Sequence, residues 1–93
     1  MALALVLARL EASRKVLQGV SGSSHFERHA SWQLRAVQAT LTEPFDDDDY
    51  VKVCAKIAEV GFPTKMEDEL MNSVELSQMH KNGKKASGLH CLC

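Results

Sequence analysis

The chain has 93 residues and a formal net charge of −1 with its histidines neutral, so it can hold one domain with one modest hydrophobic core. Apolar residues make up 45% of it, which excludes disorder along most of its length, and the near-neutral charge gives no reason to expect a polyanionic partner. Three cysteines without regular spacing exclude a disulfide framework and favour a reducing compartment.

Residues 2–18 are predicted to form the first helix. Apolar side chains recur there at helical spacing, in a stripe of Leu3, Val6, Leu7, Leu10, Val16, Leu17 and Val20. Charged residues lie towards the other side of this helix. Its apolar part is too short to cross a bilayer and is interrupted by Arg9, so we expect no membrane span.

The same segment has a second interpretation. It is amphipathic, contains arginines and serines, and has Glu11 as its one acidic residue, which is typical of a mitochondrial presequence. A core helix and a presequence that is cleaved after roughly twenty residues both fit the stripe. We keep the core helix as the main prediction.

Residues 25–41 are predicted to form the second helix, after a loop of glycines and serines. Ser24 and Glu27 have the spacing of a capping box, which places the helix start at Ser24. The inner face is predicted to carry Phe26, Ala30, Leu34, Val37 and Leu41. Trp32 projects to a different side. It either packs on a neighbouring helix, as a single tryptophan in a small domain most often does, or anchors a partner.

Residues 49–60 are predicted to form the third helix, after a break at Pro44. Phe45 is expected to plug the core between the two halves of the chain. Four consecutive aspartates, residues 46–49, come next, and we expect one of the last two to cap the helix because a carboxylate accepts hydrogen bonds from its free N–H groups. The apolar stripe of this helix is Tyr50, Val53, Cys54, Ile57 and Val60.

Residues 65–81 are predicted to form the fourth helix. Gly61 suits the left-handed position at the end of the third helix, and Pro63 prevents that helix from continuing. Thr64 and Glu67 form a capping box for the next helix. A corner this short makes the two helices neighbours. The predicted buried stripe of the fourth helix is Met66, Leu70, Met71, Val74 and Met79.

Together these elements predict an all-α fold. We expect a small four-helix domain, residues 1–82, built from two helix-turn-helix hairpins, with a mobile C-terminal tail at residues 83–93. Two hairpins of similar size can stack as in an α-solenoid or close on each other as a bundle. Because a stable solenoid needs about three repeats, we expect the closed four-helix domain.

No pattern in the chain predicts catalysis, a metal or a cofactor. His25 and His29 share a helix face at a spacing that can hold a metal, but Phe26 and Arg28 stand where the zinc-protease patterns need glutamate. A second group lacks the spacing of zinc knuckles and consists of His80, His90, Cys91 and Cys93. We therefore expect no enzymatic activity, no metal site and no cofactor.

The C-terminal Cys91-Leu92-Cys93 resembles the double-cysteine ending that is geranylgeranylated in Rab GTPases. The resemblance implies a lipid anchor at Cys91 or Cys93. It covers three residues, the chain has no phosphate-binding loop, and His90 stands where a CaaX box needs its cysteine. We therefore expect no lipid anchor.

The predicted function is a non-enzymatic helical protein–protein interaction module, an adaptor or a small subunit of a larger complex, in the cytoplasm or the nucleus. Residues 46–81 carry nine acidic and four basic side chains, so the partner is expected to be another protein with a basic surface, and no nucleic acid is expected. The predicted partner-binding residues are an acidic patch, expected to form one edge, and one aromatic side chain: Asp46, Asp47, Asp48, Asp49, Glu67, Asp68, Glu69 and Trp32.

Two alternatives stay open. One is a mitochondrial protein with a cleavable N-terminal presequence. The other is a truncated form of a larger α-helical repeat protein, in which two hairpins would be part of a longer stack.

Overall fold

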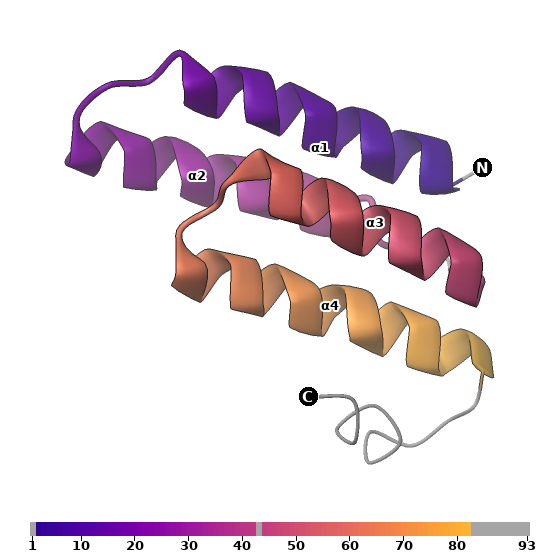
Figure 1. The fold of residues 1–93 in the computed structure, drawn as a ribbon. Coiled ribbons are helices and arrows are strands. Elements are labelled where there is room, and N and C mark those ends of the chain that lie inside the picture. The colour runs from indigo at the N-terminus through magenta and orange to yellow at the C-terminus, as the bar shows by residue number, and fades with distance from the viewer. Residues whose placement is uncertain (1, 43, 83–93) are drawn as a thin grey trace.

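A computed structural model describes residues 2–42 and 44–82, and these residues form four helices and no strand (Figure 1). The helices are α1 (Ala2–Gln18), α2 (Ser23–Gln38), α3 (Asp47–Val60) and α4 (Thr64–Asn82). The prediction of an all-α fold built from two helix-turn-helix hairpins, α1–α2 and α3–α4, is confirmed. The predicted mobile tail, residues 83–93, lies outside the described residues.

The two hairpins stack on each other with the same direction. α1 packs on α3 and α2 packs on α4, in addition to the pairs within each hairpin. The four axes run nearly side by side, and α1 and α3 begin at the same end of the molecule (Figure 1). α1 is therefore diagonally opposite α4. The arrangement combines both possibilities left open by the sequence, because the hairpins stack as in a solenoid and also enclose one common core.

The core takes side chains from all four helices and from two connections. The buried helical residues are Val6, Leu10, Leu17, Ala30, Leu34, Val37, Val53, Ile57, Val60, Leu70 and Val74. Phe45 and Phe62 come from the connections and are also buried. Phe45 fills the end of the core where the chain crosses from α2 to α3, as predicted.

The start of α2 differs from the prediction because Gly22, rather than Ser24, is its N-cap. The amide of Phe26 donates to the Gly22 carbonyl oxygen at 2.9 Å, which is the first hydrogen bond of the helix. Gly22 has a φ of 92°, which residues with a side chain rarely adopt. The conformation of Gly22 therefore starts α2 two residues earlier than the predicted capping box, and Ser24 lies inside the helix.

The start of α3 also comes earlier than predicted. Asp46 is the N-cap, with extended backbone, and its carbonyl oxygen accepts from the Tyr50 amide at 2.8 Å. The expectation that Asp48 or Asp49 caps the helix is therefore wrong. Both lie inside the first turn, where their charge still opposes the positive end of the helix dipole.

The corner between α3 and α4 follows the predicted chemistry. Gly61 ends α3 in the left-handed conformation, with φ 80° and ψ 36°. Phe62 turns into the core directly after it. The Pro63 carbonyl oxygen accepts from the Glu67 amide at 2.8 Å, so Thr64 is the first residue of α4 and not its cap.

Polar side chains fix how the helices are aligned. Ser13 is fully buried, and its Oγ donates to Gln33 Oε1 at 3.0 Å and lies 2.8 Å from the carbonyl oxygen of Arg9. The Gln38 side-chain amide donates to Ser73 Oγ at 3.0 Å and so links α2 to α4. The contact between Ser13 and Gln33 sets which turns of the antiparallel α1 and α2 lie level with each other.

Candidate interaction surfaces

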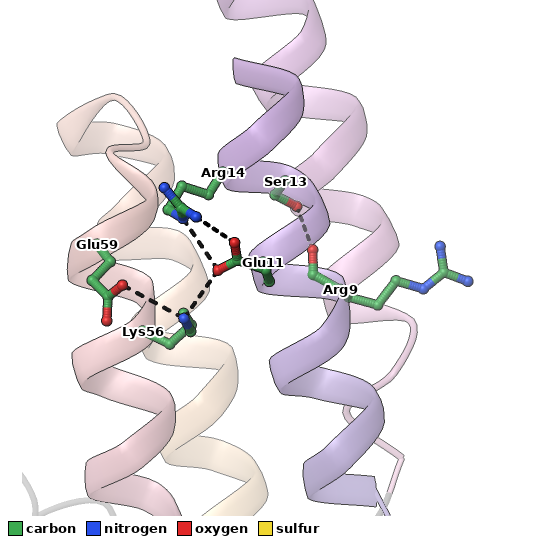
Figure 2. A network of polar contacts seen from close by, with 6 residues as sticks. All are labelled: Arg9, Glu11, Ser13, Arg14, Lys56 and Glu59. Atoms are coloured by element: carbon green, nitrogen blue, oxygen red, sulfur yellow. Dashed lines mark hydrogen bonds and ion pairs between the residues drawn. The ribbon is translucent and has the colours of Figure 1, made fainter. Parts of the chain in front are cut away.

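A cluster of charged side chains joins α1 to α3 at the surface (Figure 2). Lys56 Nζ on α3 donates to Glu11 Oε1 on α1 at 3.0 Å, and Arg14 Nε donates to the same oxygen at 3.1 Å. Arg14 Nη2 makes a second contact with Glu11 Oε2, and Lys56 also lies 3.5 Å from Glu59. The side chains of this cluster are 25–59% exposed, and every charge has an opposite neighbour. The cluster is a structural tie between the two hairpins.

The surroundings of Glu11 favour its ionised form. The hydrogen bonds from Arg14, followed by those from Lys56, lower the pKa of Glu11 to about 2. Because the pKa in the folded state lies below that of an ordinary glutamate, the tie stabilises the fold fully above pH about 4.3. That contribution is lost as the pH falls towards 2 and the carboxylate takes up a proton.

We therefore expect Glu11→Gln to reduce the pH dependence of stability in acid. Urea unfolding at pH 6, 4 and 3 measures the free energy of unfolding of both proteins. At pH 6 the wild type is expected to have the larger free energy of unfolding. The difference in this free energy between the wild type and Glu11→Gln is expected to become smaller at pH 4 and 3. Glu27→Gln, at an exposed position without an ion pair in the described part of the chain, is the control. A difference that stays constant with pH would contradict the role of Glu11.

A second polar group lies between α3 and α4. The Tyr50 hydroxyl donates to Glu75 Oε2 at 3.3 Å, and Cys54 lies one turn after Tyr50 on α3. Burial is the main cause that raises the pKa of the Tyr50 phenol and the pKa of the Cys54 thiol. Cys54 is half-buried, as a reduced thiol without the depressed pKa of a nucleophile. This group packs the two helices together and offers no activated side chain.

The two histidines on α2 differ in their surroundings. His25 is exposed and His29 is half-buried, and no group of three or more possible metal ligands occurs among residues 2–42 and 44–82. His29 instead contacts Trp32 edge to face, with ring centroids 5.2 Å apart and planes at 72°. His90, Cys91 and Cys93 of the second predicted cluster lie outside the described residues. Every buried side-chain nitrogen or oxygen in the described region has a partner.

The predicted acidic residues lie in two separate places. Asp46, Asp47 and Asp48 are exposed at the start of α3, with Asp49 half-buried beside them. Glu67, Asp68 and Glu69 occupy the first turns of α4, which starts at the opposite end of the antiparallel hairpin (Figure 1). A helix of 14 residues separates the two groups by about 20 Å. They therefore do not form the single acidic edge that the sequence suggested.

Trp32 is 56% exposed on α2, so the expectation that it packs in the core is wrong. Ala30, Leu34 and Val37 occupy the buried face of this helix. At 100° per residue, Trp32 is turned about 160° away from Leu34 and faces solvent. The sequence left one other possibility, that Trp32 anchors a partner. The exposure of Trp32 is compatible with that possibility.

Four more large apolar side chains are exposed, and sequence reasoning did not assign them to a surface: Leu5, Val16, Val51 and Leu76. Three of them, Leu5, Val51 and Leu76, lie off the predicted core stripes, and this was the signal that they could be external. Val16 was placed in the α1 stripe, but its side chain points outwards and the prediction is wrong there. More of the exposed basic residues lie on α1 and α2 (Arg9, Lys15, Arg28 and Arg35) than on α3 and α4 (Lys52 and Lys65).

No known protein family, curated protein or solved structure matches this chain. Within the described residues, no helix combines the length and the apolar character that crossing a membrane requires. The fold and the surface chemistry therefore provide the basis for a functional hypothesis.

Proposed function

We propose that the chain is a non-enzymatic helical interaction module that serves as an adaptor or a small subunit of a larger complex, in the cytoplasm or the nucleus. Its partner is another protein. The single observation that supports this proposal is the exposure of Trp32, the one tryptophan of the chain. Tryptophan is among the residues most enriched in the energetically dominant contacts of protein interfaces.

The remaining aromatic side chains strengthen the case for Trp32. Phe45 and Phe62 are buried, and Phe26 and Tyr50 are half-buried against the core. The fold thus accommodates every other aromatic residue but leaves its largest one 56% accessible. Fully burying a large apolar side chain is worth about 1.5–3 kcal/mol or more, and a bound partner would recover the share that belongs to the exposed 56% of Trp32.

The charge of the second hairpin supports a partner with a basic surface. Residues 46–81 carry nine acidic and four basic side chains, and Asp46–Asp48, Asp68 and Glu69 are exposed. Separated as they are, the two acidic groups act as two charged regions that steer a basic surface towards the α3–α4 hairpin. Phosphate groups of nucleic acids would be repelled by the same charges.

An affinity pull-down of the intact tagged chain from cell extract, read by mass spectrometry, tests this proposal. We expect one or more proteins to bind the wild type and to be lost with Trp32→Ala, because truncating an interface anchor typically costs at least about 2 kcal/mol. Leu76→Ala is the matched control, since Leu76 is 54% exposed on another helix. A variant with Asp46–Asp49 changed to lysine tests the acidic contribution separately. Partners that bind all of these variants equally would contradict the proposal.

A second candidate is favoured by the way in which the hairpins stack. α1 lies on α3 and α2 lies on α4 with matching directions, which is how successive units of an α-solenoid pack. The sequence would then belong to a larger α-helical repeat protein. The intact mass of the cellular protein that contains residues 23–82 distinguishes the two candidates, because a repeat protein requires additional helical hairpins.

A further inference from the structure

The face of the α1–α2 hairpin that points away from α3–α4 combines apolar and basic side chains. On α1, Leu5, Arg9, Ala12 and Val16 follow one another at helical spacing and are all exposed. Arg9 points away from α3, on the other side of α1 from Lys56 (Figure 2). We call this surface, together with Trp32 on α2, the outer α1–α2 face.

The alignment of the two helices places Trp32 at the level of the apolar part of α1. Trp32 directly precedes Gln33, which contacts Ser13. Because α1 and α2 are antiparallel and Ser13 meets Gln33, Trp32 comes level with the turn of α1 between Ala12 and Val16. The exposed indole of Trp32 and the exposed aliphatic side chains of α1 are therefore close in level along the hairpin.

The opposite side of the molecule has the complementary charge. Val51 and Ala58 on α3 and Asp68 on α4 are exposed on the α3–α4 hairpin, and we call them the outer α3–α4 face. Residues 46–81 carry nine acidic and four basic side chains, whereas residues 1–45 carry five basic and three acidic ones. The exposed Arg9, Lys15 and Arg28 make no ion pair within the described part of the chain. Each side thus has apolar side chains, and the two sides differ in sign.

We propose that the outer α1–α2 face binds the outer α3–α4 face of a second copy of this chain. The inference rests on the proposed function, since it names the partner of the interaction module and identifies the expected basic surface as the chain's own first hairpin. Within one copy, α3–α4 already stacks on α1–α2 in parallel register. If the same stacking is repeated between copies, the acidic α3–α4 hairpin of one copy packs on the α1–α2 hairpin of the next copy and covers Trp32.

The geometry defines the kind of assembly. Two different faces meet, so the contact is heterologous, and each added copy leaves one face of each kind available at the two ends. α1 has 17 residues and is about 25 Å long. Two adjacent helices, each about 10 Å wide, therefore give a contact area of about 500 Å² per copy. This lies below the roughly 800 Å² per partner of a standard interface, so association is weak and depends on concentration.

Sedimentation velocity of the pure intact chain tests the proposal from about 10 μM to about 1 mM, the range that reveals millimolar to micromolar dissociation constants. We expect the average mass to rise with concentration in about 20 mM salt and to rise less in about 500 mM salt, where opposite charges are screened. Leu76→Ala, which lies on neither outer face, is expected to associate as the wild type does. A chain that is monomeric throughout in low salt would overturn the proposal.

A mixing experiment tests the head-to-tail geometry. Trp32→Ala removes the aromatic side chain of one face, and Val51→Lys places a positive charge in the other, where it meets the basic outer α1–α2 face, so each variant alone is expected to be monomeric. Mixed in equal amounts, they are expected to form a one-to-one dimer that grows no further, because each retains one intact face. Circular dichroism confirms that both remain helical. No dimer in the mixture, or self-association of Trp32→Ala, would overturn the head-to-tail contact.

The outcomes separate the two proposals. A monomeric chain that still captures another protein in a manner dependent on Trp32 overturns self-association and leaves the interaction module intact. A chain that self-associates through both faces but captures no other protein supports the second copy as its partner.

Discussion

Leu70→Ala is expected to lower the free energy of unfolding by about 2–5 kcal/mol, the usual cost of truncating a buried leucine. Leu70 is fully buried on α4 and belongs to the core that all four helices share. The change removes buried methyl groups and leaves a cavity that rigid neighbouring helices cannot fill completely. In a domain with a total stability of about 5–15 kcal/mol, this is a large fraction.

Leu76→Ala provides the matched control for this prediction. Leu76 lies on the same helix, six residues or about 1.7 turns further on, and is 54% exposed. Because little apolar area is removed from the interior, its effect is expected to stay within about 0.5 kcal/mol. Urea unfolding followed by circular dichroism measures both variants. Equal losses for the two leucines would contradict the assignment of the core face of α4.

A chain that starts at Ser21, and so lacks α1, is expected to lose its cooperative unfolding transition. α1 contributes Val6, Leu10 and Leu17 to the core and contacts both α2 and α3. Its removal exposes the apolar sides of two helices and also removes the buried Ser13, so the Gln33 side chain loses its hydrogen-bonding partner. The remaining 73 residues fall in the size range in which a single core rarely supplies more than about 3–5 kcal/mol.

The control for this deletion keeps α1 but removes its outward apolar side chains. Leu5→Ala with Val16→Ala changes two exposed positions and is expected to unfold as cooperatively as the wild type. Thermal unfolding followed by far-ultraviolet circular dichroism distinguishes the two. A stable, cooperative domain without residues 1–20 would contradict the role of α1 in the core, and it would favour the presequence interpretation of that segment.

The sequence was sufficient to predict the elements of the fold, because each helix has local signals. Gly61 in the left-handed conformation followed from turn chemistry, and the buried Phe45 followed from an apolar residue in a short connection. The helix starts were less accurate. The capping-box spacing of Ser24 and Glu27 gave no sign that α2 has its N-cap at Gly22. That start depends on the positive φ of Gly22, which the sequence pattern does not show.

The surface was harder to predict than the core, since it depends on how the hairpins are placed relative to each other. Whether the acidic residues at the starts of α3 and α4 form one edge is decided by the antiparallel direction of those helices, which separates them. The position of Trp32 depends on which face of α2 meets α1 and α4. Statistics for a single tryptophan favoured burial, and packing of smaller residues at Ala30 and Val37 overrode them.

The central claim is that the fold buries a complete core and leaves Trp32 on its surface for a partner. Because Trp32 is the one tryptophan of the chain, its fluorescence reports on this position alone. Acrylamide quenching at low protein concentration and high salt, where copies are separate, measures its accessibility. We predict an emission maximum typical of a solvated indole, and quenching in the folded protein that approaches the quenching in urea. A blue-shifted emission that acrylamide quenches far less in the folded state than in urea would contradict the account.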